Sequence, residues 1–105
     1  MNDITVEELA RRRKAGEGIV LVDIREPHEI EICSLPDAKF IPMRAILADP
    51  TSIPRDVEVV LICHAGGRSG FVAANLIARG YDNVRSLRGG LDEWAIKIDP
   101  TMQRY

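Results

Sequence analysis

Residues 63–69 read Cys-His-Ala-Gly-Gly-Arg-Ser and are the part of the chain best suited to chemistry. Gly66 and Gly67 can adopt backbone conformations that turn successive N–H groups toward one point. A helix expected from about residue 69 would add its unpaired N–H groups and the positive end of its dipole. Such a loop stabilises an anion at its centre, and Cys63 is placed to be that anion as a thiolate or to attack one. The loop residues predicted to bind the substrate are His64, Ala65, Gly66, Gly67, Arg68 and Ser69.

Arg68 gives the loop a fixed positive charge and a planar set of donors for an oxyanion. Four residues separate it from Cys63, one fewer than in protein phosphatases that use a cysteine. The shorter loop suits a single sulfur atom better than a tetrahedral phosphate. A lone cysteine at a strand end is more often a small buried apolar residue, but the glycine pair and the arginine favour a nucleophile at Cys63.

Two apolar runs predict the buried strands that position this loop. Residues 19–24 and 58–62 consist mostly of Val, Ile and Leu, as in strands covered on both faces, and the second run delivers Cys63 at its carboxyl end. Further strands are expected at 39–41 and 84–87, and helices at 6–14, 27–32, 43–47, 69–79 and about 91–95. Strands that alternate with helices predict an α/β domain with a mainly parallel sheet, whose ligands bind outside the carboxyl ends of the strands.

Length and composition limit the kind of protein. The 105 residues suit a single domain, expected to span residues 1–105. Sixteen acidic and fourteen basic residues leave a net charge of −2, which argues against a nucleic-acid partner. The sequence has no apolar run that could span a membrane and no secretory signal, and its two cysteines cannot form a disulfide framework. We therefore expect a cytoplasmic protein with neither a metal site nor a cofactor.

Five motifs follow one another along most of the chain: LVDIREPHE at 21–29, LPDAKFIP at 35–42, CHAGGRS at 63–69, GYDNV at 80–84 and LRGGLDEW at 87–94. Together they resemble a rhodanese domain, of the thiosulfate sulfurtransferase type. The resemblance implies a three-layer α/β/α sandwich around a parallel five-stranded sheet. It also implies that Cys63 carries sulfur as a persulfide.

One branch of that family resembles the chain more closely. Residues 31–36 and the tail 98–105 are similar to the rhodanese domain fused to adenylyltransferases of molybdopterin and thiamine sulfur transfer. The resemblance implies a sulfur-carrier protein or an adenylyltransferase as partner, and leaves open whether the chain stands alone or is part of a larger protein. Some members of that branch end the loop in an acidic residue. Arg68 at this position is expected to favour small dianionic donors such as thiosulfate.

Four further residues have candidate roles around the nucleophile. Asp23 and Arg25 end their strand on the same sheet edge as Cys63, and by resemblance they support the site as an ion pair or a brace; a plain surface salt bridge is the alternative. His64 could act as an acid or base or bind a metal, but an outward position at the mouth is favoured. Cys33 could act as a resolving thiol, but a half-buried free thiol in a turn is favoured, because nothing basic is expected around it.

Three arginines are expected around the mouth of the site. Arg85 and Arg88 would join Arg68 in a basic rim that suits an acidic carrier protein. Trp94 is expected as a core lid over the end of the sheet, and His28 on the surface.

The predicted function is sulfur transfer by covalent catalysis. The Cys63 thiolate attacks the sulfane sulfur of thiosulfate or of a protein persulfide, and a thiol, a carrier protein or cyanide then accepts the sulfur. The prediction requires loop amides that face the Cys63 sulfur, and a sulfur that is open to solvent. One alternative is a non-catalytic binding or regulatory module that docks a sulfur carrier or another partner. Another is a small phosphatase or arsenate reductase.

Overall fold

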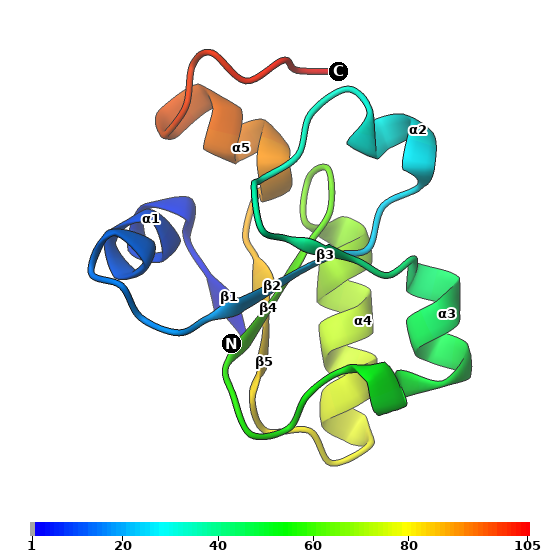
Figure 1. Cartoon of the computed structure of the whole chain (residues 1–105). Coiled ribbons are helices and arrows are strands. Elements are labelled where there is room, and N and C mark those ends of the chain that lie inside the picture. The colour runs from blue at the N-terminus through cyan, green and yellow to red at the C-terminus, as the bar shows by residue number, and fades with distance from the viewer. Residues whose placement is uncertain (1) are drawn as a thin grey trace.

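The computed structural model describes residues 2–105 (Figure 1). Five strands form one parallel sheet in the order β1-β5-β4-β2-β3. The strands are β1 (Asp3–Ile4), β2 (Val20–Asp23), β3 (Lys39–Phe40), β4 (Val59–Ile62) and β5 (Val84–Leu87). The helices are α1 (Val6–Lys14), α2 (Pro27–Ile30), α3 (Met43–Ala48), α4 (Gly67–Ala78) and α5 (Gly90–Lys97), with a 3-10 turn at Pro50–Ser52.

Strand β4 lies in the middle of the sheet and ends one residue before Cys63. It pairs with β2 from Val59 opposite Val20 to Ile62 opposite Asp23, and with β5 on its other side. All of its residues are buried. Because the strands run in the same direction, the carboxyl ends of β2, β4 and β5 share one edge of the sheet, at the top of Figure 1. The loop after β4 therefore lies at this edge, beside the residue that ends β2.

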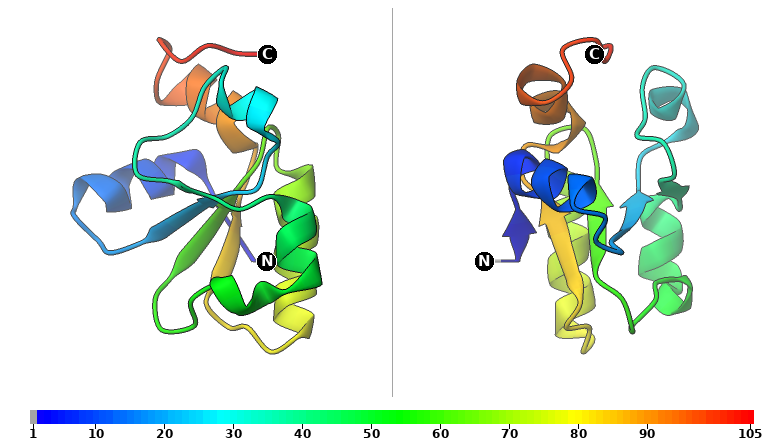
Figure 2. Two further views of the ribbon diagram at one scale, coloured as in Figure 1. Left: turned by 45° about the vertical axis from the view of Figure 1, so that its right-hand side comes forward. Right: turned by 60° about the vertical axis from the view of Figure 1, so that its left-hand side comes forward.

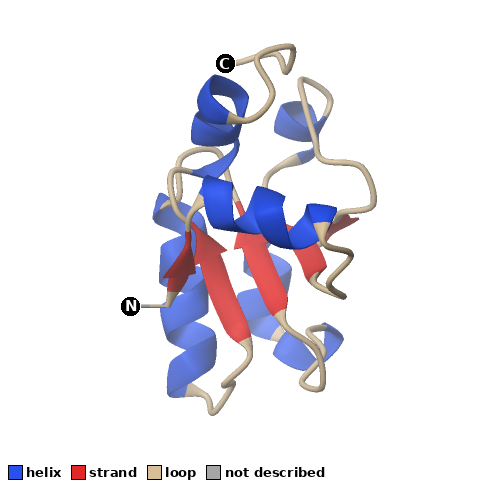
Figure 3. Ribbon diagram, turned by 90° about the vertical axis from the view of Figure 1, so that its left-hand side faces the viewer, coloured by secondary structure: helices blue, strands red, loops and turns tan. Residues whose placement is uncertain are grey.

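Helices cover both faces of the sheet and divide the core into two parts. Figure 2 shows α1 and α4 on opposite sides of the strands, and Figure 3 shows α1 in front of the sheet with α3 and α4 behind it. Val60 and Ile62 pack with apolar residues of α1 and α5, whereas Val59 and Leu61 pack with residues of α3 and α4. Side chains alternate along a strand, so Cys63 belongs to the second cluster and lies on the side of α4.

This architecture confirms the predicted three-layer α/β/α sandwich with a parallel five-stranded sheet. The sequence did not indicate β1, because two residues are too few to show a period; Asp3 and Ile4 pair with Ser86 and Leu87 of β5. Helix α2 is shorter than expected, and α4 begins two residues earlier, at Gly67. Within residues 2–105, no helix has the length and apolar character needed to cross a membrane.

Candidate active site

The loop between β4 and α4 directs main-chain donors at the Cys63 sulfur. The N–H group of Gly66 donates to Cys63 Sγ at 3.1 Å, and the N–H group of Ser69 donates to it at 3.4 Å. Gly66 has a φ of 101° and precedes the first residue of α4, so the chain turns back toward the end of β4. The predicted orientation of the loop amides is present in the structure.

Gly90 allows this loop to pack against the start of α5. A Cβ atom on Gly90, whose φ is +60°, would lie 2.5 Å from the carbonyl oxygens of both Cys63 and His64. Leu91 N donates to the Cys63 carbonyl at 3.0 Å, and Asp92 N donates to the His64 carbonyl at 2.9 Å. The N-terminus of α5 therefore fixes the first two carbonyls of the loop, next to the residues whose amides face the sulfur. The sequence indicated only a turn before α5, and not this support.

Two buried hydroxyl groups extend the contacts of the sulfur. Ser69 Oγ lies 3.3 Å from Cys63 Sγ and 2.6 Å from Ser86 Oγ on β5. A thiolate carries no hydrogen, so in that state the contact is a hydrogen bond only when Ser69 donates its single proton to the sulfur, and Ser86 can then donate to Ser69. The sequence analysis did not identify Ser86 as a site residue. The pattern that could have indicated it is a hydroxyl side chain within the otherwise apolar end of β5. Cys63, Gly66, Ser69 and Ser86 are called the thiol cradle below.

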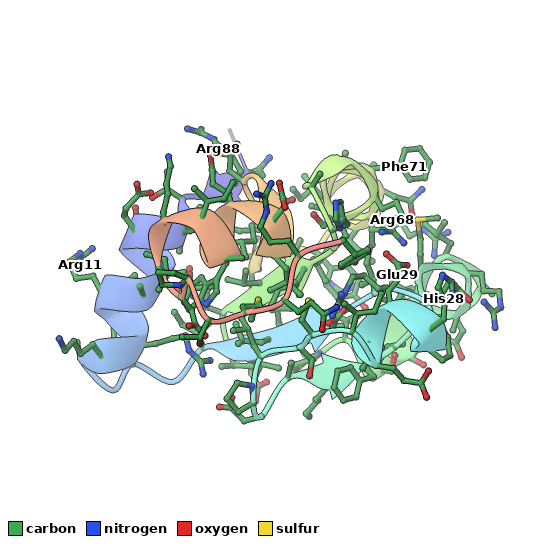
Figure 4. All side chains as sticks on the ribbon, turned by 90° about the horizontal axis from the view of Figure 1, so that it is seen from above. Arg11, His28, Glu29, Arg68, Phe71 and Arg88 are labelled. Carbon is green, nitrogen blue, oxygen red and sulfur yellow. The ribbon has the colours of Figure 1, made fainter. Side chains whose placement is uncertain are left out.

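The Arg68 guanidinium is held by a carboxylate. Its Nη1 and Nη2 atoms donate to the two carboxylate oxygens of Glu29 on α2, each at 2.8 Å, and Figure 4 shows the two side chains facing each other. The hydrogen bonds from Arg68 lower the pKa of Glu29 from 4.5 to about 2, against the opposing effect of burial. The same bonds raise the pKa of Arg68. The guanidinium expected to bind a donor is therefore already paired.

Tyr105 in the C-terminal tail completes the surroundings of Glu29. Its hydroxyl donates to Glu29 Oε2 at 2.8 Å and accepts from Arg25 Nη1 at 2.9 Å. Its ring lies edge-on against the ring of His64, with centroids 4.1 Å apart. Burial raises the pKa of Tyr105, and the hydrogen bond from Arg25 opposes that effect. The tail therefore joins α2 to the active-site loop, a link between segments far apart in sequence that no local pattern indicated.

Asp23 and Arg25 form a buried ion pair. Arg25 Nη2 donates to Asp23 Oδ2 at 2.7 Å, and both side chains are at most 1% exposed. Arg25 Nη2 also donates to the Cys33 carbonyl at 2.7 Å, and Nη1 to the Glu29 carbonyl at 3.3 Å. Burial alone would lower the pKa of Arg25, but the hydrogen bonds to Asp23 and Tyr105 raise it overall. The pair is thus a brace for α2 and the chain after it, and a surface salt bridge is excluded. Asp23, Arg25, Glu29, Arg68 and Tyr105 are called the charged cluster below.

The expectation of a sulfur open to solvent is wrong for this conformation, because Cys63 is only 1% exposed. Its side chain is packed among core residues on the α4 side. The C-terminal tail crosses the same edge of the sheet, between α5 and α2 (Figure 4). A donor can therefore reach the Cys63 sulfur only after side chains at this edge move.

The remaining candidates fall outside the cradle. His64 is half-buried beside Tyr105, and no group of three metal-ligating side chains occurs within residues 2–105. Cys33 is a partly buried free thiol, as favoured, but Arg25 Nη1 lies 3.9 Å from its sulfur, so a basic group is near it after all. Trp94 is buried in the core and His28 is exposed, as expected.

The predicted basic rim of three arginines is wrong. Arg88 donates to both carboxylate oxygens of Asp3, each at 3.0 Å. Arg85 lies 3.6 Å from a carboxylate oxygen of Glu8 and 3.7 Å from one of Glu58. Figure 4 shows Arg88 well separated from Arg68. Each of these arginines faces an acid, so their charges do not add up to a patch.

Fold and loop together define a class: an α/β domain that holds a cysteine at the carboxyl end of its central strand and aims main-chain amides at the sulfur. Residues 5–97 match the family model of the rhodanese-like domain. The chain belongs to the rhodanese-like family.

Individual relatives agree with this assignment. The sulfurtransferase of Allochromatium vinosum is 42% identical over 95 residues, which cover 90% of this chain and 89% of that protein. The adenylyltransferase and sulfurtransferase of Ogataea parapolymorpha is 31% identical over 103 residues, which cover 97% of this chain but only 25% of the longer protein. The crystal structure of a rhodanese-related protein from Thermoplasma volcanium superposes with a TM-score of 0.83 at 26% identity, covering 93% of this chain and 94% of that one. These relatives support a function of the sulfurtransferase type.

Proposed function

We propose that this chain is a rhodanese-type sulfurtransferase that carries sulfane sulfur as a persulfide on Cys63. The observation that supports it most directly is the pair of amides, from Gly66 and Ser69, that donate to Cys63 Sγ. Amide dipoles directed at one point stabilise a sulfur anion there. They act without any change of protonation, so they can serve both the thiolate and a sulfur bound to it.

The proposed reaction has two displacements. The Cys63 thiolate attacks the sulfane sulfur of the donor, a bond from Sγ to that sulfur forms, and the donor's own bond to that sulfur breaks. With thiosulfate, sulfite leaves with the electron pair; with a persulfide, a thiolate leaves. A nucleophilic acceptor then attacks the outer sulfur of the persulfide and releases the Cys63 thiolate, so no net oxidation or reduction takes place.

The acceptor that we propose is a thiol or a sulfur-carrier protein. A relative that is named both adenylyltransferase and sulfurtransferase supports a partner of this kind, since it contains a domain like this chain within a longer protein. Arg68, Arg85 and Arg88 are paired with acids and form no basic rim, so we propose that a carrier is recognised mainly by shape and hydrogen bonds.

The burial of Cys63 favours a second candidate, a non-catalytic module that docks a sulfur carrier or another partner. Because Cys63 as a residue is only 1% exposed, its sulfur is not ready to react with a donor from solvent. A module that only docks would keep this closed conformation and would never acquire sulfur.

Mass spectrometry distinguishes the sulfurtransferase from the docking module. The protein is measured after incubation with thiosulfate or with a small-molecule persulfide. Transfer predicts a gain of about 32 Da on Cys63 that a reducing agent removes. The gain should persist in Cys33→Ala and vanish in Cys63→Ala. If neither donor modifies Cys63, the sulfurtransferase proposal is wrong and the docking module remains.

A further inference from the structure

Glu29 is paired with Arg68, the one positively charged residue of the active-site loop. We propose that Glu29 determines donor specificity by neutralising Arg68, so that the site disfavours small dianionic donors such as thiosulfate and accepts thiol persulfides. The proposal rests on the sulfurtransferase function above. It reverses the expectation drawn from Arg68 alone, because the carboxylate that already faces Arg68 offsets its positive charge at the site.

The geometry makes Arg68 a poor anion receptor as it stands. Both of its terminal nitrogens are committed to the Glu29 carboxylate, at 2.8 Å each. Further donors fix that carboxylate, since Glu26 N donates to Oε1 at 3.1 Å and the Tyr105 hydroxyl donates to Oε2 at 2.8 Å. The Glu29 side chain is only 10% exposed. A dianion must therefore displace a carboxylate that is held from three sides, or bind next to it.

Electrostatics then separate the two classes of donor. Thiosulfate brings two negative charges and releases sulfite, whose three oxygens need donors other than the two amides at the sulfur. A thiol persulfide brings at most one charge and releases a single thiolate. In that transfer the Cys63 thiolate bonds to the outer sulfur, the sulfur–sulfur bond of the donor breaks, and the thiol leaves with the electron pair and takes up a proton from water. It requires no free guanidinium.

Tyr105 acts in the same direction by holding Glu29 in place. Its hydroxyl bridges Arg25 and Glu29, so its loss leaves the carboxylate with fewer donors. Tyr105→Phe keeps the ring that packs on His64 and removes only the bridge. Tyr105→Phe should therefore shift the donor preference toward thiosulfate, as Glu29→Gln does, but by a smaller factor.

The test measures anion binding without chemistry. In a Cys63→Ala background, calorimetric titration with thiosulfate should show about tenfold tighter binding for Glu29→Gln than for the parent, because one negative charge beside the anion is gone. Glu31→Gln is the matched control: Glu31 is exposed at the end of the same helix, and this change alters net charge equally. A further Arg68→Gln substitution should abolish the gain. Equal binding in Glu29→Gln and the parent, an equal gain in Glu31→Gln, or a gain that survives Arg68→Gln overturns the proposal.

Kinetics with the intact nucleophile give a second readout. Glu29→Gln should lower the KM for thiosulfate about tenfold and leave the KM for a neutral organic persulfide within about twofold. Tyr105→Phe provides the same comparison if Glu29→Gln does not fold. Failure of Cys63 to acquire sulfur from any donor would contradict the sulfurtransferase proposal, whereas an unchanged ratio of the two KM values contradicts only the role of Glu29.

Discussion

The thiol cradle and the charged cluster lie side by side but stabilise charge in different ways. In the cradle, the hydrogen-bond partners of the Cys63 sulfur are neutral groups: two main-chain amides that donate to it and one hydroxyl. In the charged cluster, two carboxylates face two guanidinium groups, and a tyrosine hydroxyl bridges them. The cradle keeps its positive potential directed at the sulfur, whereas the charges of the cluster cancel.

The difference shows which structural feature maintains the thiol cradle and which maintains the charged cluster. The cradle depends on backbone conformation, because amides aim correctly only if the loop keeps its turn. The charged cluster depends on every buried charge keeping its partner, because a buried charge that loses its partner lowers the free energy of unfolding. Substitutions that act on backbone geometry, on charge or on a single hydroxyl can therefore test the two halves separately.

The largest effect is expected in the charged cluster, from Asp23→Ala. Arg25 would remain buried with its carboxylate partner removed, which should reduce the free energy of unfolding by about 3 to 5 kcal/mol in urea denaturation. Arg44→Ala is the control, since it breaks a pair with Glu26 in which the Arg44 side chain is 74% exposed; its effect should stay within about 1 kcal/mol. Equal effects would show that water compensates Arg25 and that the cluster is not a closed unit.

A somewhat smaller effect is expected from backbone geometry, with Gly90→Ala. The new Cβ atom would meet the carbonyl oxygens of Cys63 and His64, at a φ that disfavours any side chain. We expect a loss of about 2 to 4 kcal/mol in the free energy of unfolding, together with loss of sulfur transfer. Gly18→Ala is the control, because its Cβ would meet nothing within 4 Å. Activity that survives Gly90→Ala would mean that α5 does not set the position of the loop.

Acid should weaken the charged cluster through Glu29. Its pKa is lower in the folded protein, about 2, than its ordinary value of 4.5, so the folded state favours the carboxylate. The stabilisation is therefore complete above about pH 4.5 and is lost as the pH falls toward 2, with a total of about 3 kcal/mol. Urea denaturation at a series of pH values should show this loss in the parent protein, and a smaller one in Glu29→Gln. Parallel curves for the two proteins would contradict it.

The parts of the site that the sequence predicted are those encoded within a short stretch of chain. The buried run before Cys63, the glycine pair and the start of a helix are consecutive, so local patterns were enough to predict a strand, a tight loop and inward amides. The family resemblance added the fold and the supporting role of Asp23 and Arg25. The structure confirms the five-stranded parallel sheet and shows the two residues as a buried ion pair, whereas their role in supporting the reaction stays a prediction.

The parts that could not be predicted depend on contacts between distant segments. A sequence gives the charge of Arg68 but not its partner, and Glu29 reaches it only because α2 and the loop after β4 meet at one edge of the sheet. Tyr105 joins them from the other end of the chain. The burial of Cys63 depends likewise on what packs over it, which is why its exposure was predicted wrongly.

The smallest effect, and the sharpest test of the cradle, is expected from Ser86→Ala. Without the Ser86 hydroxyl, Ser69 Oγ loses the 2.6 Å neighbour that donates to it when Ser69 donates to the sulfur, so its own O–H becomes a weaker donor to the sulfur and the competing contact with the Gly66 carbonyl, 3.3 Å away, gains weight. The free energy of unfolding should fall by about 1 kcal/mol, and alkylation of Cys63 by iodoacetamide, measured in a Cys33→Ala background, should slow by about three- to tenfold. Ser86→Thr should restore the rate, because it restores the hydroxyl, and Ser34→Ala on the surface should not change it. An unchanged rate in Ser86→Ala would show that the amides alone hold the sulfur anion.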